Sequence, residues 1–418
     1  MLHFVFLQGM PSAFFSRVGD RLLAQDAKVT RINFCMGDWL FWHGNNTVNY
    51  RGTLDRWPDF FRAFCQREQV TDLVLLGEQR QYHRQAVEVS KAMGIRISVT
   101  DFGYLRPDWI TLERDGMSGN SLFPRHPDEI RGLSAHALAA GSPEVDLRPE
   151  YADSATAMAV GDLLFSYANV LLWWLYPFYQ RSDKRPHPLI YFPAIGWRLL
   201  RVRLGRYHSV NRAEQLIAAD DAPCFVFPLQ LEHDFQIVAY SRFVELDEAI
   251  GEVLQSFARH ASPDAHLIVK AHPWDPGLKN WHRRVMRLAG HFGVAERVIF
   301  LDGGSLDQLL ARAAGMVTVN STSGFSALLA GCPVCLLGEA VYDVSGLVHQ
   351  DGLDTFWRHP TKPDASLVRD FIRALVATSQ LRGVFFAEPG MGVAVEAMAQ
   401  RLFNGSVGEI RYNAQNVL

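Results

Sequence analysis

The sequence predicts an α/β protein with two Rossmann-type domains, each built on a parallel sheet. The chain has 418 residues, which is more than a single hydrophobic core ordinarily organises. Short apolar runs alternate with amphipathic stretches in two successive series, and this alternation is typical of parallel strands covered by helices. We expect a first domain over residues 1–210, a second over residues 211–418, and a central cleft that both sheets face.

The first series supplies the strands of the first domain. Apolar runs that predict strands occupy residues 2–9, 29–35, 71–78 and 95–103. Between them, residues 57–69 and 82–93 have the spacing of amphipathic helices. Ligands of parallel sheets gather where the strands end. The loops that begin near Gln8, residue 77 and Asp101 are therefore candidate binding positions.

The second series has the same character. Apolar runs that predict strands occupy residues 222–230, 266–275, 297–305, 315–324 and 332–339. We expect a helix through residues 325–330 and a mostly helical tail over residues 364–403.

The stretch between the two series raises a membrane question. Residues 163–180 carry no charge, but they are barely long enough to span a bilayer, and Ser166, Asn169 and Pro177 interrupt them. We favour a buried or interfacial helix over a span. Side chains of the kinds that settle at headgroup depth are also present. They are Trp173, Trp174, Tyr176 and Tyr179.

A basic segment follows this aromatic stretch. It is either a solvated helix face or a patch that faces anionic lipid. Its members are Arg181, Lys184, Arg185, Arg198, Arg201, Arg203 and Arg206.

Composition argues against several classes of protein. A net charge of -3 does not suit a general nucleic-acid binder, which needs a basic excess. The five cysteines are odd in number and imply no disulfide framework. Cys332 and Cys335 form a C-x-x-C that lacks the second ligand pair of a metal site. The opening apolar run has no basic n-region and no cleavage site, so we expect a cytoplasmic protein.

One predicted strand end in the second domain carries two carboxylates. Glu232 and Asp234 follow Gln230, at the carboxyl end of a predicted parallel strand that faces the cleft. A carboxylate in this place could attack an electrophilic carbon or shuttle protons. The alternative is that Asp234 caps the helix that follows.

Two further strand ends carry groups that suit an anion. Lys270 and His272 precede a turn shaped by Pro273 and could neutralise a phosphate, although a lone His is often structural. The loop Asn320, Ser321, Thr322, Ser323 and Gly324 opens a predicted helix. Free N–H groups and hydroxyls at a helix start suit a phosphate, and plain N-capping is the competing interpretation.

These motifs together resemble the KpsS/KpsC capsule polysaccharide family. The matching segments are FLQG-x-P-S-x-FF at residues 6–15, FGYLRPDWITLE at 102–113, QLEHDFQI at 230–237, KAHP at 270–273 and NSTSGFSALLAGCPV at 320–334. The resemblance implies a GT-B-like fold and a glycosyltransferase that moves Kdo from CMP-Kdo with retention and a β linkage. It implies a phosphatidylglycerol lipid acceptor at the inner membrane, to which the enzyme is peripheral. CMP leaves as one phosphate monoester, and no Asp-x-Asp occurs where a metal would be expected, so we expect no metal and no cofactor beyond the donor. Other capsule assembly proteins are possible partners.

The resemblance also assigns roles to residues. Asp234 would form a covalent sugar adduct, and His272 would stabilise the CMP leaving group. Ser321 and Ser323 would hold the donor phosphate. Independently of the resemblance, the order of the three strand ends predicts that one pocket places the phosphate on Lys270, His272 and this loop. Glu232 and Gln230 would assist the catalytic Asp234. Gln8, Asp101 and Arg106 would lie on the acceptor side.

Two alternatives stay open at this point. The first is a transferase of the same fold that uses another donor, such as CMP-sialic acid or a UDP-sugar. The second is a non-enzymatic export or scaffold component of capsule assembly.

Overall fold

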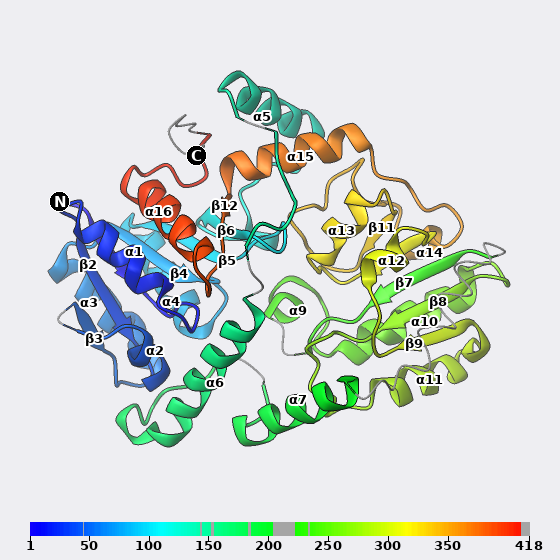
Figure 1. Ribbon diagram of the computed structural model, residues 1–418, viewed down its shortest axis with the longest axis horizontal. Helices are drawn as coiled ribbons and strands as arrows, with labels where there is room; N and C mark the ends of the chain where they lie inside the picture. Colours follow the sequence, from blue (N-terminus) through cyan, green and yellow to red (C-terminus); the bar gives the residue numbers. More distant parts are fainter. Residues whose placement is uncertain are drawn as a thin grey trace. The chain divides into compact units, whose positions relative to one another are not determined.

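The chain forms two compact units in the computed structural model (Figure 1). The structure describes residues 1–44, 46–142, 144–151, 154–182, 185–203, 222–232 and 235–410. Unit 1 consists of Met1–Phe123, Gly132–Lys184 and Ile372–Leu418, and unit 2 consists of Pro124–Arg131 and Arg185–Phe371.

Unit 1 contains a sheet in the strand order β12-β6-β5-β4-β1-β2-β3. The strands are β1 (His3–Phe6), β2 (Lys28–Asn33), β3 (Thr47–Asn49), β4 (Asp72–Leu76), β5 (Arg96–Phe102), β6 (Trp109–Arg114) and β12 (Gln380–Arg382). The pairings from β3 to β5 are parallel, whereas β6 is antiparallel to both β5 and β12. Neighbouring strands β1 and β4 mark the point where the chain changes direction across the sheet.

Unit 1 also contains the helices that accompany this sheet. They are α1 (Phe14–Leu23), α2 (Met36–Phe41), α3 (Trp57–Glu68), α4 (Gln81–Met93), α6 (Ala155–Leu171) and α16 (Gly390–Phe403), and α5 (Pro127–Ala139) crosses the unit boundary. Phe4 and Phe6 alternate with Val5 along β1 and pack with Phe14 of α1 and Met398 of α16 in one core. The pleat thus directs every second side chain of β1 into this layer.

The expected boundaries of the two domains differ from those in the structure. We expected a single boundary between residues 210 and 211, yet the chain returns to unit 1 at Ile372. Two contacts account for the return: β12 pairs with β6, and α16 buries an apolar face against α1. The tail is mostly helical as predicted, in α15 (Ala365–Thr378) and α16, but β12 interrupts it.

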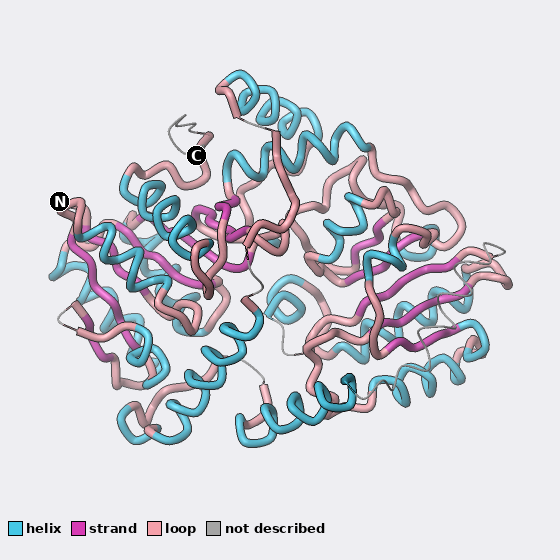
Figure 2. The backbone as a smooth tube through the Cα atoms, viewed as in Figure 1, coloured by secondary structure: helices cyan, strands magenta, loops and turns pink. Residues whose placement is uncertain are grey.

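Unit 2 contains a fully parallel sheet in the order β11-β10-β7-β8-β9. The strands are β7 (Cys224–Pro228), β8 (His266–Lys270), β9 (Val298–Leu301), β10 (Gly315–Thr318) and β11 (Val334–Leu336). The helices are α7 (Pro188–Arg203), α9 (Phe235–Tyr240), α10 (Leu246–His260), α11 (Trp281–His291), α12 (Leu306–Leu310), α13 (Ser323–Leu329), α14 (Leu353–Phe356) and α15, which crosses into unit 1. Figure 2 distinguishes these strands from the surrounding helices.

The core of unit 2 follows from the alternation of side chains along β7. Phe225 and Phe227 pack with Phe257 of α10 on one face, while Val226 packs with Leu309 of α12 on the other. The predicted fold class, α/β with parallel-rich sheets in two units, is therefore confirmed.

The charge-free stretch 163–180 is only partly helical. It begins within α6, continues through a 3-10 turn at Trp173–Leu175 and ends in a loop. Trp173 and Trp174 are exposed, but Tyr176 is buried and donates a hydrogen bond to Asn49. Across the described ranges, we find no helix with both the length and the apolar character that a bilayer crossing requires.

Candidate functional site

A clasp between two buried amides joins neighbouring loops of unit 2. Gln230 lies two residues after β7 and Asn320 two residues after β10. The Gln230 Nε2 donates to Asn320 Oδ1 at 3.0 Å, and the Asn320 backbone N–H donates to Gln230 Oε1 at 3.1 Å. Because β7 and β10 are adjacent and the chain reverses its direction of winding between them, this is the topological switch point where α/β sheets bind ligands. Both predicted residues therefore lie together, and their contact fixes the spacing of the two loops.

The serine loop after β10 has a defined internal geometry. Ser323 Oγ donates to Ser321 Oγ at 2.9 Å, and the Ser323 backbone N–H donates to the same Ser321 oxygen at 3.2 Å. Tyr342 donates its hydroxyl proton to the Ser321 carbonyl. Gly324 permits this approach, because a Cβ there would lie 2.1 Å from the Tyr342 hydroxyl. The loop thus presents two adjacent hydroxyls at the start of α13.

Simple N-capping by a Ser or Thr side chain describes only part of the geometry of this loop. Thr322 is the N-cap residue of α13, and its side chain makes no capping hydrogen bond. Ser321 instead accepts the local N–H, as short hydroxyl side chains do in turns.

The loop after β8 carries the predicted lysine and histidine. Lys270 ends the strand and is only 6% exposed. Burial lowers the pKa of Lys270, the charge of Arg198 lowers it further, and Asp302 opposes both effects. The His272 Nδ1 accepts the Trp274 N–H at 3.1 Å, so a neutral His272 carries its proton on Nε2. The loop therefore combines a buried ammonium with an oriented imidazole.

Arg198 braces this loop from α7. Its guanidinium donates to the Asp275 backbone carbonyl and to Asp302 Oδ1, the latter at 2.8 Å. Asp275 in turn accepts from the Trp281 Nε1 at 2.9 Å. The Arg198 side chain is only 11% exposed. We expected this residue on a solvated or lipid-facing surface, and for Arg198 that expectation is wrong because both acids draw it inward.

Glu232 belongs to an acidic group near the β7 loop. Carboxylate oxygens of Glu232, Glu245 and Asp247 lie within 4.8 Å of one another. Lys279 pairs with Glu232, and Arg284 pairs with Asp247 at 2.5 Å. Basic side chains therefore balance much of this negative charge. Asp234, the predicted nucleophile, lies outside the described residues.

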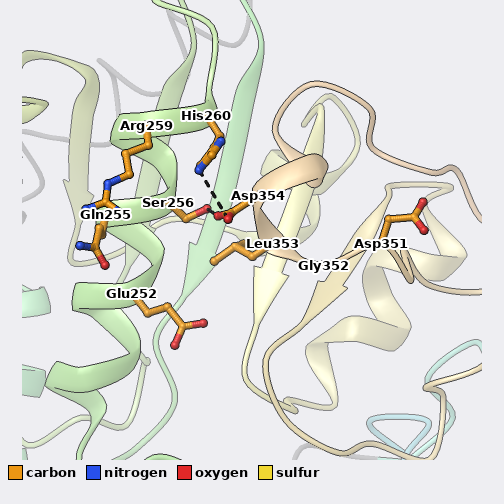
Figure 3. A pocket seen from close by; sticks show the side chains of 9 residues that line it. All are labelled: Glu252, Gln255, Ser256, Arg259, His260, Asp351, Gly352, Leu353 and Asp354. Atoms are coloured by element: carbon orange, nitrogen blue, oxygen red, sulfur yellow. Dashed lines mark hydrogen bonds and ion pairs between the residues drawn. The ribbon is translucent and has the colours of Figure 1, made fainter.

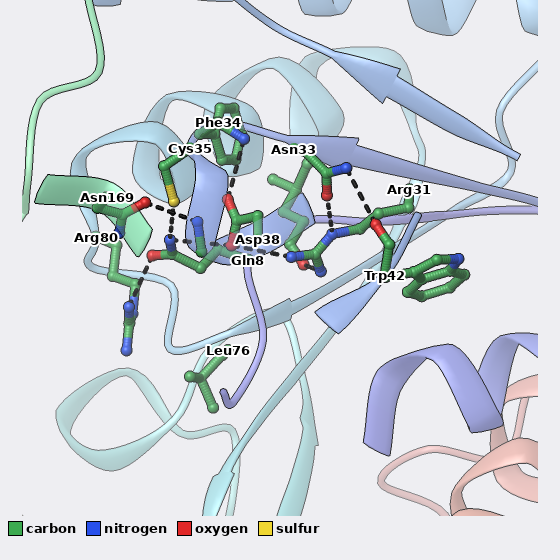
Figure 4. Close-up of polar contacts among 12 residues, drawn as sticks. Gln8, Arg31, Asn33, Phe34, Cys35, Asp38, Trp42, Leu76, Arg80 and Asn169 are labelled. Atoms are coloured by element: carbon green, nitrogen blue, oxygen red, sulfur yellow. Dashed lines mark hydrogen bonds and ion pairs between the residues drawn. The ribbon is translucent and has the colours of Figure 1, made fainter. Parts of the chain in front are cut away.

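Unit 1 has its own polar network at the corresponding strand end (Figure 4). Gln8 Nε2 donates to Asp38 Oδ1 at 3.1 Å, and Arg80 donates to Gln8 Oε1 at 2.9 Å. Arg31 pairs with the same Asp38 oxygen at 3.1 Å. Gln8 Nε2 also donates to the Tyr179 hydroxyl at 3.4 Å. Gln8 is buried and engaged at both ends of its amide.

The other two predicted residues of unit 1 lie near the end of β5. Asp101 accepts the Phe102 N–H at 2.7 Å. Arg106 is exposed, and its guanidinium lies 5.0 Å from the Phe102 ring centroid. Both residues therefore contact Phe102, whereas Gln8 belongs to the buried network around Asp38.

Comparison with known proteins decides the family. Residues 71–386 match the family described as capsule polysaccharide biosynthesis protein. The chain belongs to this family. It is 30% identical over 390 residues to the capsule polysaccharide export protein KpsS of Escherichia coli, covering 92% of this chain and 96% of that protein. It is also 30% identical over 390 residues to the capsule polysaccharide modification protein LipB of Neisseria meningitidis serogroup A, covering 91% of each.

A solved structure is also similar to this capsule biosynthesis protein. It is the Thermosulfurimonas dismutans KpsC β-Kdo 2,7 transferase, with 16% identity and a TM-score of 0.47, covering 96% of this chain and 99% of that one. The family match spans all the unit 2 loops described above but begins after Gln8.

A separate polar groove of unit 2 lies between α10 and α14 (Figure 3). Ser256 donates to Asp354 Oδ1 at 2.5 Å, His260 lies 3.4 Å from the other carboxylate oxygen, and Trp357 donates to Ser256 at 2.8 Å. The sequence-predicted site residues do not line it. Ser256, His260 and Asp354 contact one another across it, which ties α10 to α14, so we assign these three residues a structural role.

Proposed function

We propose that this protein is a retaining β-Kdo transferase, which moves Kdo from CMP-Kdo to a phosphatidylglycerol or lysophosphatidylglycerol acceptor at the cytoplasmic face of the inner membrane. The product would start the Kdo linker of a capsular polysaccharide. Family membership supports the pathway. The observation that carries the assignment of the site is the clasp between Gln230 and Asn320, because it holds the loop leading to Asp234 beside the serine loop.

The unit 2 loops supply the groups that a departing CMP needs. Phosphate charge grows as the bond to the sugar breaks, and fixed donors aimed at that charge lower the barrier. His272 would donate from Nε2, since its Nδ1 is occupied by Trp274. Lys270 would contribute a positive charge, and Ser321 and Ser323 would contribute hydroxyl donors. One phosphate needs no diphosphate-chelating metal.

Two displacements would give retention. In the first, a carboxylate oxygen of Asp234 forms a bond to the anomeric carbon, and the bond from that carbon to the CMP oxygen breaks with its electron pair on CMP. In the second, an acceptor hydroxyl attacks the same carbon, the Asp234 carboxylate leaves, and the hydroxyl proton passes to a base. Each step inverts the centre, so the pair preserves its configuration.

Glu232 is a candidate for that base. Its carboxylate pairs with Lys279, which anchors it beside the loop that follows β7. Gln230 and Asn320 would act as positioning residues for the loops. Asp101 and Arg106 would lie toward the acceptor, with Gln8 supporting their sheet edge.

Incubation with CMP-Kdo and a short-chain phosphatidylglycerol tests the proposal. We expect CMP release together with a lipid-linked Kdo whose linkage is β by NMR. The Asp234→Ala variant should lose at least about a thousandfold in turnover, as expected when a nucleophile is removed. Full activity of that variant would exclude Asp234 as the nucleophile. Transfer from CMP-sialic acid or a UDP-sugar, but not from CMP-Kdo, would reassign the donor.

The export name of the Escherichia coli relative suggests a further control. In a capsule-deficient strain lacking this protein, the Asp234→Ala variant should fail to restore capsule. Restoration would favour a scaffold over an enzyme.

A further inference from the structure

The outer face of α7 is apolar although it is exposed. Leu189, Ile190, Trp197 and Leu200 are 58%, 56%, 64% and 48% exposed, respectively. On a helix with 3.6 residues per turn these four positions fall on one side, so they form one stripe along α7. The inner face is different, because Arg198 turns toward Asp275 and Asp302. An amphipathic helix of a soluble core normally has the opposite arrangement, with its apolar stripe inward.

The charge around this stripe favours an anionic partner. Residues 185–203, which belong to unit 2, include four basic residues and no acidic one, although the whole chain has a net charge of -3. Arg201 extends the stripe by one step at its C-terminal end and is exposed. Trp197 is the residue type that settles at the headgroup level of a bilayer.

A second surface of the same composition occurs in unit 1. Leu171, Trp173, Trp174 and Phe178 are all exposed there. A bilayer accepts several such faces without shape complementarity to each, whereas a protein partner would need a matching surface for each one. A second copy of this chain would bring like charges together, since a two-fold interface pairs a surface with itself.

We propose that the outer face of α7, formed by Leu189, Ile190, Trp197 and Leu200 with Arg201, docks on an anionic lipid bilayer. This inference deepens the proposed function by naming the surface that meets the lipid, and it rests on that function for the choice of membrane. Insertion of the stripe to headgroup depth buries its apolar side chains, while Arg201 remains at the charged surface. Through Arg198, the docked helix also contacts the loops after β8 and β9.

Vesicle binding by the full chain, measured without any donor, tests this surface. The probes are vesicles of phosphatidylcholine alone and vesicles with equal parts of phosphatidylcholine and phosphatidylglycerol. We expect binding to the anionic vesicles, weakened by salt. The double variant Trp197→Ser with Leu200→Ser should bind about tenfold more weakly or worse, because it removes two large apolar groups from the contact. Val244→Ser is the matched control, since Val244 is 62% exposed in the same unit but lies outside the stripe.

A site-specific probe keeps the test independent of the double variant's folding. All five native cysteines are buried, so an environment-sensitive dye on Leu200→Cys reports that position. We expect a blue shift with anionic vesicles and none for the same dye on Val244→Cys. Unchanged binding by the double variant, or a silent dye at position 200, would overturn the proposal. A shift that depends on protein concentration without vesicles would indicate a second copy instead.

The transferase proposal is tested separately with the short-chain acceptor in the absence of vesicles. A stripe variant that no longer binds vesicles but still releases CMP would show that the stripe serves membrane docking and not the chemistry. Intact vesicle binding without CMP release would contradict the transferase and leave the docking surface in place.

Discussion

The two units use a glutamine at the same place but surround it differently. Gln8 lies two residues after β1, and Gln230 lies two residues after β7. Each amide reaches across a switch point to the loop of the neighbouring strand, to Arg80 in unit 1 and to Asn320 in unit 2.

The surroundings distinguish a structural network from a candidate binding site. In unit 1, Gln8 donates to Asp38, and that carboxylate is already paired with the buried Arg31. In unit 2 the clasp is a neutral amide pair, and the neighbouring strand β8 ends at Lys270, two residues before His272. These are the two residues that we propose to meet an anion. Under the proposed function, the same strand-end position serves stability in one sheet and ligand binding in the other.

Breaking the buried ion pair of unit 1 should give the largest effect on stability. Asp38→Asn leaves Arg31 charged and buried without its partner, which costs about 3–5 kcal/mol. Urea unfolding should register this loss. Asp59→Asn, which removes an exposed pair with Arg62, should change stability by less than about 1 kcal/mol. Equal effects from the two variants would contradict the structural role of the Gln8 network.

Removing the His272 imidazole should lower turnover and leave the stability of the fold nearly unchanged. His272→Ala should lower kcat about 100- to 1000-fold, because a donor to the leaving phosphate is lost. The control is His266→Ala, since His266 begins the same strand at the opposite edge of the sheet. Steady-state CMP release measures both. A His272 variant with unchanged kcat would remove the imidazole from the chemistry.

The buried carboxyl of Glu113 in unit 1 should make the stability of the protein depend on pH. Burial raises the pKa of Glu113 to about 7, and the nearby Glu78 carboxylate adds to the rise. The neutral form is therefore favoured in the fold, and its contribution to stability is complete below about pH 4.5 and is lost as the pH rises through about 7. Glu113→Gln should be more stable than the parent at pH 8 by roughly 3 kcal/mol, and close to it near pH 4.5.

Urea unfolding at the two pH values measures this difference. Glu88→Gln, at an exposed position of α4, should show no such divergence. A parent protein whose stability is flat between these pH values would refute the assignment.

The smallest effect is expected at the clasp itself. Gln230→Leu leaves the buried groups of Asn320 with fewer partners, which costs about 1–3 kcal/mol in stability. It should also weaken CMP binding, because the serine loop loses its brace. Gln8→Leu should lower stability without changing CMP affinity. Calorimetric titration of CMP into both variants checks this, and equal affinities would break the proposed distinction between the units.

Much of the fold followed from local pattern, and what was missed depended on distant partners. Every predicted strand is present, because each has an apolar run that the sheet buries on both faces. β3, β6 and β12 were not predicted. β3 and β12 have three residues each, and β12 is a strand only through its pairing with β6, far away in sequence.

The site shows the same limit. Strand-end loops identified Gln230, Lys270, His272 and the serine loop, since position alone selects them. Arg198 was misassigned because its partners lie 77 and 104 residues further along the chain. The sequence of residues 181–206 alone does not show which arginine faces the interior, because that depends on acidic partners elsewhere in the chain.

A crystal of the full chain soaked with CMP would show where the donor nucleotide binds. We expect the phosphate to lie against the His272 imidazole and the hydroxyls of Ser321 and Ser323, at the ends of β7, β8 and β10. CMP bound at the strand ends of unit 1, or in the groove between α10 and α14, would contradict this placement.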